Sequence, residues 1–331
     1  MKAKKKDIQE EALVKKLVAG DRTALAQAIT LIESSKTEHV ESANSILEQC
    51  LKQRTNSVRI GITGVPGVGK STFIEAFGKY LTTSGNKVAV LAIDPSSSVS
   101  KGSILGDKTR MGELSKDTNA FIRPSASGDS LGGVAQKTKE SIILCEAAGY
   151  NVIFIETVGV GQSETAVDNM VDFFLLLKLA GAGDELQGIK RGIMEMADAI
   201  VINKADGDNI KQAQAAKTEF ARALHLYPPK ENGWTPKVLT CSALEKSGLK
   251  EVWELIQNFL KTTKDNGHFI KQRKSQDVKW FTEHVDMLVK RHFYQQQKVK
   301  LDLEPMLSAI DENRMSPFKA AQILIKKHLI E

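Results

Sequence analysis

A glycine-rich stretch early in the chain has the residue types that bind a phosphate. In VRIGITGVPGVGKSTFIEAFGKYL, Gly64 and Gly69 are separated by four residues, and Lys70 and Ser71 follow directly. Glycines let the backbone turn successive N–H groups toward an anion, and the start of the following helix adds positive potential. Lys70 is expected to reach the β- and γ-phosphates of a nucleotide, and the Ser71 hydroxyl to bind Mg²⁺. An ordinary glycine-rich turn does not explain why Lys and Ser follow in this order. The predicted phosphate loop comprises Gly64, Val65, Pro66, Gly67, Val68, Gly69, Lys70, Ser71 and Thr72.

Two later apolar runs end in an acid, which nucleotide chemistry needs. KVAVLAI is followed by Asp94, and NVIFIE ends in Glu156. A doubly wound sheet binds its ligand at the carboxyl ends of its strands, so we predict that both acids face the phosphates. Such an acid holds the hydration shell of Mg²⁺ or orients the attacking water, and both acids are therefore predicted catalytic residues together with Lys70. The predicted metal ligands are Ser71, Asp94 and Glu156. The N–H group of Gly159 is expected to contact the γ-phosphate.

A third motif indicates which base the nucleotide carries. DAIVINKAD places Asn203, Lys204 and Asp206 at the end of another predicted strand. A carboxylate at position 206 can accept hydrogen bonds from the N1–H and 2-amino groups of guanine, which adenine cannot offer. The stem of Lys204 is expected to lie over the ring. The next strand end contributes three further predicted contacts, Ser242, Ala243 and Leu244, of which the first two could present N–H groups to the guanine O6. GTP is therefore predicted in preference to ATP.

The stretch GAGDELQGIK, residues 181–190, interrupts two apolar runs with glycines and polar side chains. We expect it at the ligand edge of the sheet, between two predicted strands. Because no glutamine directly follows Gly159, the isolated protein is expected to orient its water poorly and to hydrolyse GTP slowly. Our hypothesis is that Asp184, Gln187 and Lys190 form a third switch, in which a partner brings Gln187 or Lys190 to the nucleotide for catalysis. The plainer alternative is an exposed polar connection.

Two other loops are candidate switches. Residues 96–108 follow Asp94 and are rich in Ser and Gly, so we interpret them as the first switch. Residues 158–164 follow Glu156 and are interpreted as the second. Plain surface loops remain the alternative for both.

Seven short β-rich runs position these residues: VRIGIT, KVAVLAI, AFIRPS, NVIFIE, DFFLLLKL, DAIVINK and PKVLTC. Several are continuously apolar, as expected of strands that helices cover on both faces. The pattern predicts an α/β fold of the P-loop NTPase type, with a doubly wound, mostly parallel sheet over residues 56–262. Residues 1–55 show helical spacing of apolar positions and are predicted to form a helical extension, with Asp21 and Thr37 as candidate N-caps.

Residues 263–331 return to a helical pattern and are predicted to form a C-terminal helical arm. Pro305 and Pro317 are expected in first helical turns, where a proline costs no hydrogen bond. Apolar residues recur at steps of three and four along the arm. They include Val278, Phe281, Val285 and Leu288. This apolar seam is either intramolecular core or a dimer interface, and the sequence leaves both open.

Composition places the 331 residues among ordinary globular proteins. Lys and Arg number 46 against 40 Asp and Glu, a net charge of +6 that is spread widely and is typical of a solvated surface. The three cysteines lie far apart, which favours neither disulfides nor a metal site and indicates a reducing compartment. No apolar run is long enough to span a bilayer. We expect a cytoplasmic protein in a bacterium, or one in a matrix-like compartment after removal of a transit peptide.

With these residues identified, the chain resembles the MeaB/ArgK family of GTPases, which includes the human methylmalonic aciduria type A protein. The resemblance covers nearly the whole chain. It rests on GVPGVGKST, AIDPSSS, GSILGDKTRM, FIRPSASGDSLGGVA, ETVGVGQSE, GAGDELQGIKRGIMEMAD and NKAD, in this order. It implies a P-loop protein of the signal-recognition-particle, MinD and BioD class, with GTP or GDP and Mg²⁺ as ligands. It also implies a homodimer joined through C-terminal helices, and a chaperone that loads and protects adenosylcobalamin-dependent methylmalonyl-CoA mutase or a relative.

Three other functions compete with this interpretation. A kinase of a transport-binding protein would need a base for a protein hydroxyl, and no motif marks one. A nickel or cobalt metallochaperone GTPase would show clustered His or Cys, whereas the six histidines are scattered. A pure interaction module with a structural nucleotide would not need Lys70, Asp94 and Glu156 together.

Overall fold

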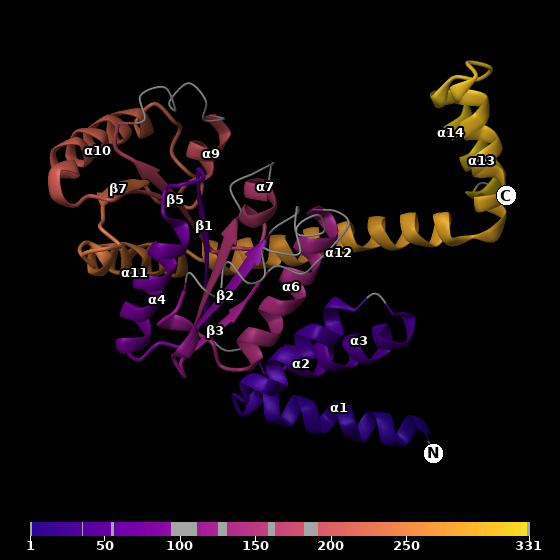
Figure 1. The fold of residues 1–331 in the computed structure, drawn as a ribbon, viewed down its shortest axis with the longest axis horizontal. Coiled ribbons are helices and arrows are strands. Elements are labelled where there is room, and N and C mark those ends of the chain that lie inside the picture. The colour runs from indigo at the N-terminus through magenta and orange to yellow at the C-terminus, as the bar shows by residue number, and fades with distance from the viewer. Residues whose placement is uncertain are drawn as a thin grey trace. The chain divides into compact units, whose positions relative to one another are not determined.

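The computed structural model describes residues 2–34, 36–53, 56–93, 111–124, 131–157, 163–181 and 191–329 (Figure 1). The chain divides into two compact units, Met1–Arg273 and Lys274–Glu331. Each unit has its own cluster of buried apolar side chains.

A seven-stranded sheet forms the centre of the first unit. Its strands are β1 (Val58–Gly64), β2 (Val88–Ile93), β3 (Ala120–Arg123), β4 (Val152–Thr157), β5 (Phe173–Leu179), β6 (Ala199–Asn203) and β7 (Lys237–Thr240). Their spatial order is β3-β2-β4-β1-β5-β6-β7, and every described pair is parallel. Each of the seven predicted runs contains one of these strands, so the predicted fold class is confirmed. The order places β1 and its glycine-rich continuation in the middle of the sheet.

Helices cover both faces of the sheet, as the continuously apolar strands predicted. They are α4 (Lys70–Thr83) and α11 (Leu249–Asp265) on one face, and α6 (Leu131–Ala147), α7 (Ser163–Asp168), α9 (Arg191–Met196) and α10 (Ile210–Leu224) on the other (Figure 1). Two short 3-10 turns, η1 (Leu114–Lys116) and η2 (Gly207–Asn209), lie in connections. On the α4 side, the rings of Phe77 and Phe154 stack with centroids 5.5 Å apart. On the α7 side, a Cβ on Gly61 would lie 2.8 Å from Val167, so α7 approaches β1 too closely for a side chain there.

Three helices precede the sheet: α1 (Lys2–Val18), α2 (Arg22–Glu33) and α3 (Thr37–Leu51). Asp21 caps α2 as predicted, because its carboxylate accepts hydrogen bonds from the N–H groups of Thr23 and Ala24. The prediction of Thr37 as the N-cap of α3 was wrong by one residue. Lys36 occupies the cap position with an extended backbone, and helical geometry already begins at Thr37. The helices α2 and α3 pack against α6.

Three helices follow the sheet: α12 (His268–Gln295), α13 (Gln297–Asp311) and α14 (Pro317–Leu329). Pro317 begins α14 as predicted, but the prediction for Pro305 was wrong, because this residue lies inside α13. A proline there removes a helical hydrogen bond. We attribute the longer helix to packing, since Val299 and Leu324 are buried together with Phe293 in the core of the second unit. Tertiary packing has overridden the local preference of proline.

The apolar seam of α12 is exposed. Phe281 has 70% of its surface accessible and Val278 has 66%, while Val285 and Leu288 are at the limit between exposed and half-buried. Within the described residues, Phe281 and Val278 are therefore not part of a buried core. These side chains have no cover within the described residues.

Charged side chains fasten the beginning of α12 to the amino edge of the sheet. Arg273 donates to both carboxylate oxygens of Asp172, at 2.7 and 2.6 Å, and to the carbonyl oxygen of Ser57 at 3.0 Å. The same carboxylate of Asp172 accepts a hydrogen bond from the backbone N–H of Arg59 at 2.8 Å. The side chain of Arg59 in turn contacts Glu146 at 2.8 Å, and both are buried. Residues next to the starts of β1 and β5 are thus joined to one another and to α12.

Candidate functional site

The glycine-rich loop connects the central strand to a helix. It begins where β1 ends at Gly64 and finishes where α4 begins at Lys70. Gly67 and Gly69 have φ values of +82° and +90°, which L-residues with side chains rarely adopt. The Lys70 ammonium donates to the carbonyl oxygens of Gly64 at 2.7 Å and Val65 at 3.3 Å. Lys70 therefore reaches back across the loop, while Pro66, Gly67 and Thr72 are exposed.

The predicted acid of β4 lies beside the start of α4. Ser71 Oγ donates a hydrogen bond to Glu156 Oε1 at 3.3 Å, and Glu156 is only 6% exposed. The strand register pairs Glu156 with Ile62 of β1, two residues before the loop begins. The structure thus brings together two of the three predicted metal ligands. The third, Asp94, lies outside the described residues, as do the other predicted contacts Gly159, Asp184, Gln187 and Lys190.

The Asn-Lys-x-Asp motif at the end of β6 is bound to the glycine-rich loop. Asn203 Nδ2 donates to the carbonyl oxygen of Val68 at 2.9 Å, and Lys204 Nζ donates to that of Gly67, also at 2.9 Å. Asn203 is 1% exposed, and its amide nitrogen lies 3.0 Å from where a Cβ on Gly69 would stand. The two motifs, which are separated by more than 130 residues in the sequence, therefore form one site.

The segment after β7 closes the other side of this motif. Ser242 Oγ donates a short hydrogen bond to Asp206 Oδ2, and the N–H of Ala243 lies 3.4 Å from Asn203 Oδ1. Leu244 is 77% exposed, so it offers an apolar surface beside the motif. The predicted residues of the two strand ends therefore meet, as the parallel sheet requires of neighbouring carboxyl ends.

Sequence reasoning missed two further contacts, one of the Lys204 backbone and one of the helix α4 that follows the loop. Asn209 Nδ2 donates to the carbonyl oxygen of Lys204 at 2.6 Å, where Lys204 has a left-handed φ of +57°. Glu75, one turn beyond Ser71 on α4, accepts the N–H groups of Glu113 and Leu114 at 2.7 and 3.1 Å. An Asn shortly after the motif was a possible signal for the first contact. No local signal marks the second, because its partners lie 38 and 39 residues away.

The chemistry of the site is that of oxygen ligands and backbone groups. Burial raises the pKa of the Cys241 thiol to about 12, so this neighbour of Ser242 stays protonated and is a poor nucleophile. Among the residues that the structure describes, no group of three or more His, Cys, Asp or Glu side chains could hold a metal ion.

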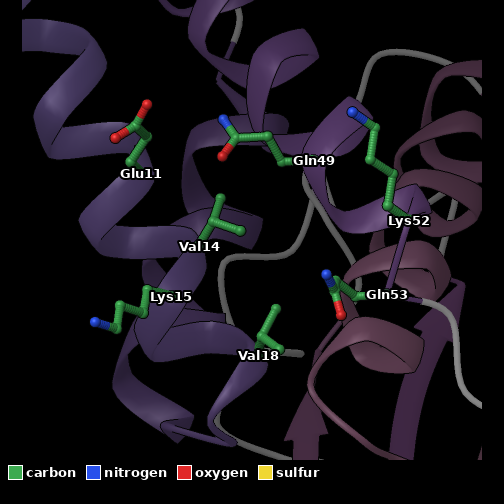
Figure 2. A pocket seen from close by; sticks show the side chains of 7 residues that line it. All are labelled: Glu11, Val14, Lys15, Val18, Gln49, Lys52 and Gln53. Atoms are coloured by element: carbon green, nitrogen blue, oxygen red, sulfur yellow. The ribbon is translucent and has the colours of Figure 1, made fainter.

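A separate pocket lies between α1 and α3. It has a volume of about 420 Å³. It is lined by Glu11, Val14, Lys15, Val18, Gln49, Lys52 and Gln53 (Figure 2). None of these residues belongs to the predicted site, and the lining mixes both signs of charge with two valines.

None of the helices in the described ranges is long and apolar enough to cross a membrane.

A parallel sheet whose central strand runs into a glycine-rich loop, with an Asn-Lys-x-Asp motif bound to that loop, defines the class of P-loop GTPases. The model of one family, described as "Methylmalonyl Co-A mutase-associated GTPase MeaB", matches residues 25–298. The chain therefore belongs to this family, and the resemblance noted from its motifs is confirmed.

The sequences of individual relatives are similar to this chain over most of their length. The chain is 47% identical to the protein named GTPase ArgK of Escherichia coli (strain K12), over 92% of each chain. It is 46% identical to the mitochondrial methylmalonic aciduria type A homolog of Mus musculus, covering 94% of this chain and 77% of that protein. A solved structure named LAO/AO transport system kinase is 39% identical, with a TM-score of 0.76 over 96% of this chain and 97% of that chain. Relatives named GTPases and this fold together identify an enzyme that hydrolyses GTP.

Proposed function

We propose that this GTPase is a Mg²⁺-dependent chaperone that assists the loading and protection of an adenosylcobalamin-dependent acyl-CoA mutase, methylmalonyl-CoA mutase or a relative. The observation that carries the proposal is membership of a family described as associated with that mutase, over 25–298. The geometry supports the nucleotide half of the proposal, because loop and base motif form one site. We propose a cytoplasmic location for the same protein.

The phosphates are proposed to bind on the loop between β1 and α4. The N–H groups of the loop and the start of α4 supply positive potential, and Lys70 is already held in the loop through its own contacts with carbonyl oxygens. When nucleotide binds, we propose that the Lys70 ammonium exchanges these carbonyl oxygens for phosphate oxygens. Ser71 and Glu156 present two oxygen atoms beside α4 and fit Mg²⁺, which would neutralise developing phosphate charge when bound.

The base is proposed to bind against Asn203, Lys204 and Asp206. Ser242 Oγ fixes the carboxylate of Asp206, which then accepts the N1–H and 2-amino hydrogens of guanine. The bond from Lys204 to the carbonyl oxygen of Gly67 stretches its aliphatic stem across the site, where a ring can lie on it. We propose the N–H groups of Ser242 and Ala243 for the guanine O6, and Leu244 as an apolar neighbour.

We propose that the client completes the catalytic site. Asp94 and Glu156 are proposed for Mg²⁺ and water, Gly159 for the γ-phosphate, and Gln187 and Lys190 for a partner-responsive loop. We further propose a homodimer through the C-terminal helices, which the exposed seam of α12 supports.

The GTPase rate tests this function. We expect the purified protein to hydrolyse GTP slowly, and a mutase of this family from the same organism to raise the rate at least about tenfold by positioning the water and charge. GTP labelled at the γ-phosphate separates free phosphate from phosphate transferred to protein.

The double variant Gln187→Ala, Lys190→Ala tests the proposed role of the loop at residues 181–190. It should keep the basal rate within a factor of about two and lose most of the stimulation. Absence of stimulation with intact basal hydrolysis contradicts the chaperone function, and stimulation that survives in the double variant contradicts the third switch.

A further inference from the structure

Two buried threonines join the phosphate loop to the acid of β4. Thr157 Oγ1 donates a hydrogen bond to Thr63 Oγ1 at 2.8 Å, and their exposed fractions are 0% and 2%. Thr63 directly precedes Gly64, and Thr157 directly follows Glu156. We propose that this hydroxyl pair is a positioning contact that sets how the phosphate loop and Glu156 face each other during GTP hydrolysis. The inference rests on the roles proposed above for that loop and for Glu156.

The pair lies where the two central strands separate. The register between β1 and β4 ends at Ile62 and Glu156, one residue before the two threonines. Beyond that point β1 continues beside β5, with Gly64 opposite Leu177, while β4 continues beside β2, with Thr157 opposite Ile93. The two strands therefore separate directly before the phosphate loop on β1 and directly after Glu156 on β4. The hydrogen bond between the two hydroxyls joins a side chain of β1 to a side chain of β4 one residue beyond their last paired residues.

The register neighbours of the pair on β5 and β2 are apolar. In the register, Thr63 lies beside Leu176 and Thr157 beside Ile93, and both neighbours are buried. Valine has the same branched shape and would fill this space without the cost of burying a hydroxyl. The two hydroxyls therefore add a directional contact rather than packing.

A small change in this contact is expected to reach the reacting groups. Glu156 is one residue from the pair and accepts from Ser71 at 3.3 Å, a distance near the limit of a hydrogen bond. The loop begins one residue from the pair on the other strand. Because catalysis depends on alignment within fractions of an ångström, a tilt between the ends of β1 and β4 should affect turnover more than nucleotide affinity.

Valine variants separate positioning from packing. Thr63→Val and Thr157→Val each leave one buried hydroxyl without its partner and should lower the midpoint of thermal unfolding, whereas the double variant should recover most of it. We expect kcat for GTP to fall about tenfold in all three variants, with KM and the affinity for a fluorescent GDP analogue changed by less than about twofold. Serine at both positions keeps the hydroxyls and should restore kcat.

The matched control is Thr263→Val, because Thr263 is also fully buried but bonds to the carbonyl oxygen of Phe259 on α11. It should lower the unfolding midpoint and leave kcat unchanged. A double valine variant with native kcat overturns the proposal and leaves the threonines as packing residues. Lys70→Ala and Glu156→Gln, assayed in parallel, test the proposed site itself, so that its failure is distinguishable from failure of the threonine contact.

Discussion

At the scale of single residues, Asp206 has the most specific of the proposed binding roles. Its carboxylate accepts a hydrogen bond from Ser242, which orients it. A carboxylate accepts two hydrogens from guanine, whereas an amide offers one acceptor and one donor. In the proposed base site, the identity of a single side-chain atom therefore decides which purine fits.

We predict that Asp206→Asn exchanges the preference of the site from guanine to xanthine, because the new NH₂ group can donate to the oxygen at C2 of xanthine. GTP affinity should fall by about tenfold or more while the affinity for xanthosine triphosphate rises. Competition with a fluorescent GDP analogue measures both. The exposed neighbour Asp208→Asn serves as the control and should change neither affinity. Unchanged GTP binding in Asp206→Asn would show that the base assignment is wrong.

Residue types and spacing predict the members of the proposed site but not the contacts between them. Gly64, Lys70 and Ser71 follow one another in a recognisable order, because one loop must perform several tasks on one phosphate chain. The bond between Thr63 and Thr157 has no such local signal, because its partners are 94 residues apart and either residue alone is an ordinary strand threonine. Contacts that depend on strand order are visible only once the order is known.

At the scale of elements, Asp117 joins α4 to the beginning of β3. Its carboxylate accepts from Lys79 at 2.6 Å, from Thr82 at 2.8 Å and from the N–H of Asn119 at 2.9 Å. The bond from Lys79 is the largest of the causes that lower the pKa of Asp117, to about 2. The helix that begins at the phosphate loop is thereby fixed to the edge of the sheet.

This link should be visible as a pH-dependent stability. The folded pKa of Asp117 lies below its ordinary value of 3.8. Its contribution to the free energy of unfolding is therefore complete above about pH 4 and is lost as the pH falls toward 2. We predict that Asp117→Asn lowers the free energy of unfolding by about 2 kcal/mol at pH 7 and by much less near pH 2. Urea denaturation at several pH values measures the difference. The exposed Asp265→Asn is the control, and a difference that does not depend on pH would contradict the assignment.

The elements themselves were predictable where pattern and packing agree. All seven strands appear because continuous apolar runs need cover on both faces, and the helices between them supply it. Pro305 was misplaced because the burial of Val299 and Leu324 extends α13 through it. The order of the strands was not predictable from the runs, since every parallel neighbour is a long-range contact.

At the scale of the whole molecule, the second unit presents an apolar surface that the first unit's chemistry does not use. Phe281 and Val278 of α12 are more than half exposed. Large exposed apolar side chains in a regular helical row are typical of an interface. The proposed homodimer would cover them with the same residues of a second copy.

We predict that Phe281→Glu converts the proposed dimer to a monomer, because a charge replaces the most exposed side chain of the seam. Analytical ultracentrifugation over a range of concentrations measures the association. The matched control is Lys279→Glu on the same helix, where one charge replaces another. A wild-type protein that sediments as a monomer contradicts the homodimer, and a dimer that persists in Phe281→Glu places its interface elsewhere.

The contacts of Arg273 at the amino edge of the sheet have a mechanical consequence. Arg273 holds Ser57 and Asp172, which stand immediately before β1 and β5. These two strands lie side by side, and at their far ends β1 becomes the phosphate loop while β5 leads toward residues 182–190. Because one arginine side chain holds the beginnings of two neighbouring strands, the spacing of β1 and β5 at this edge and the anchorage of the first turns of α12 depend on the same contacts.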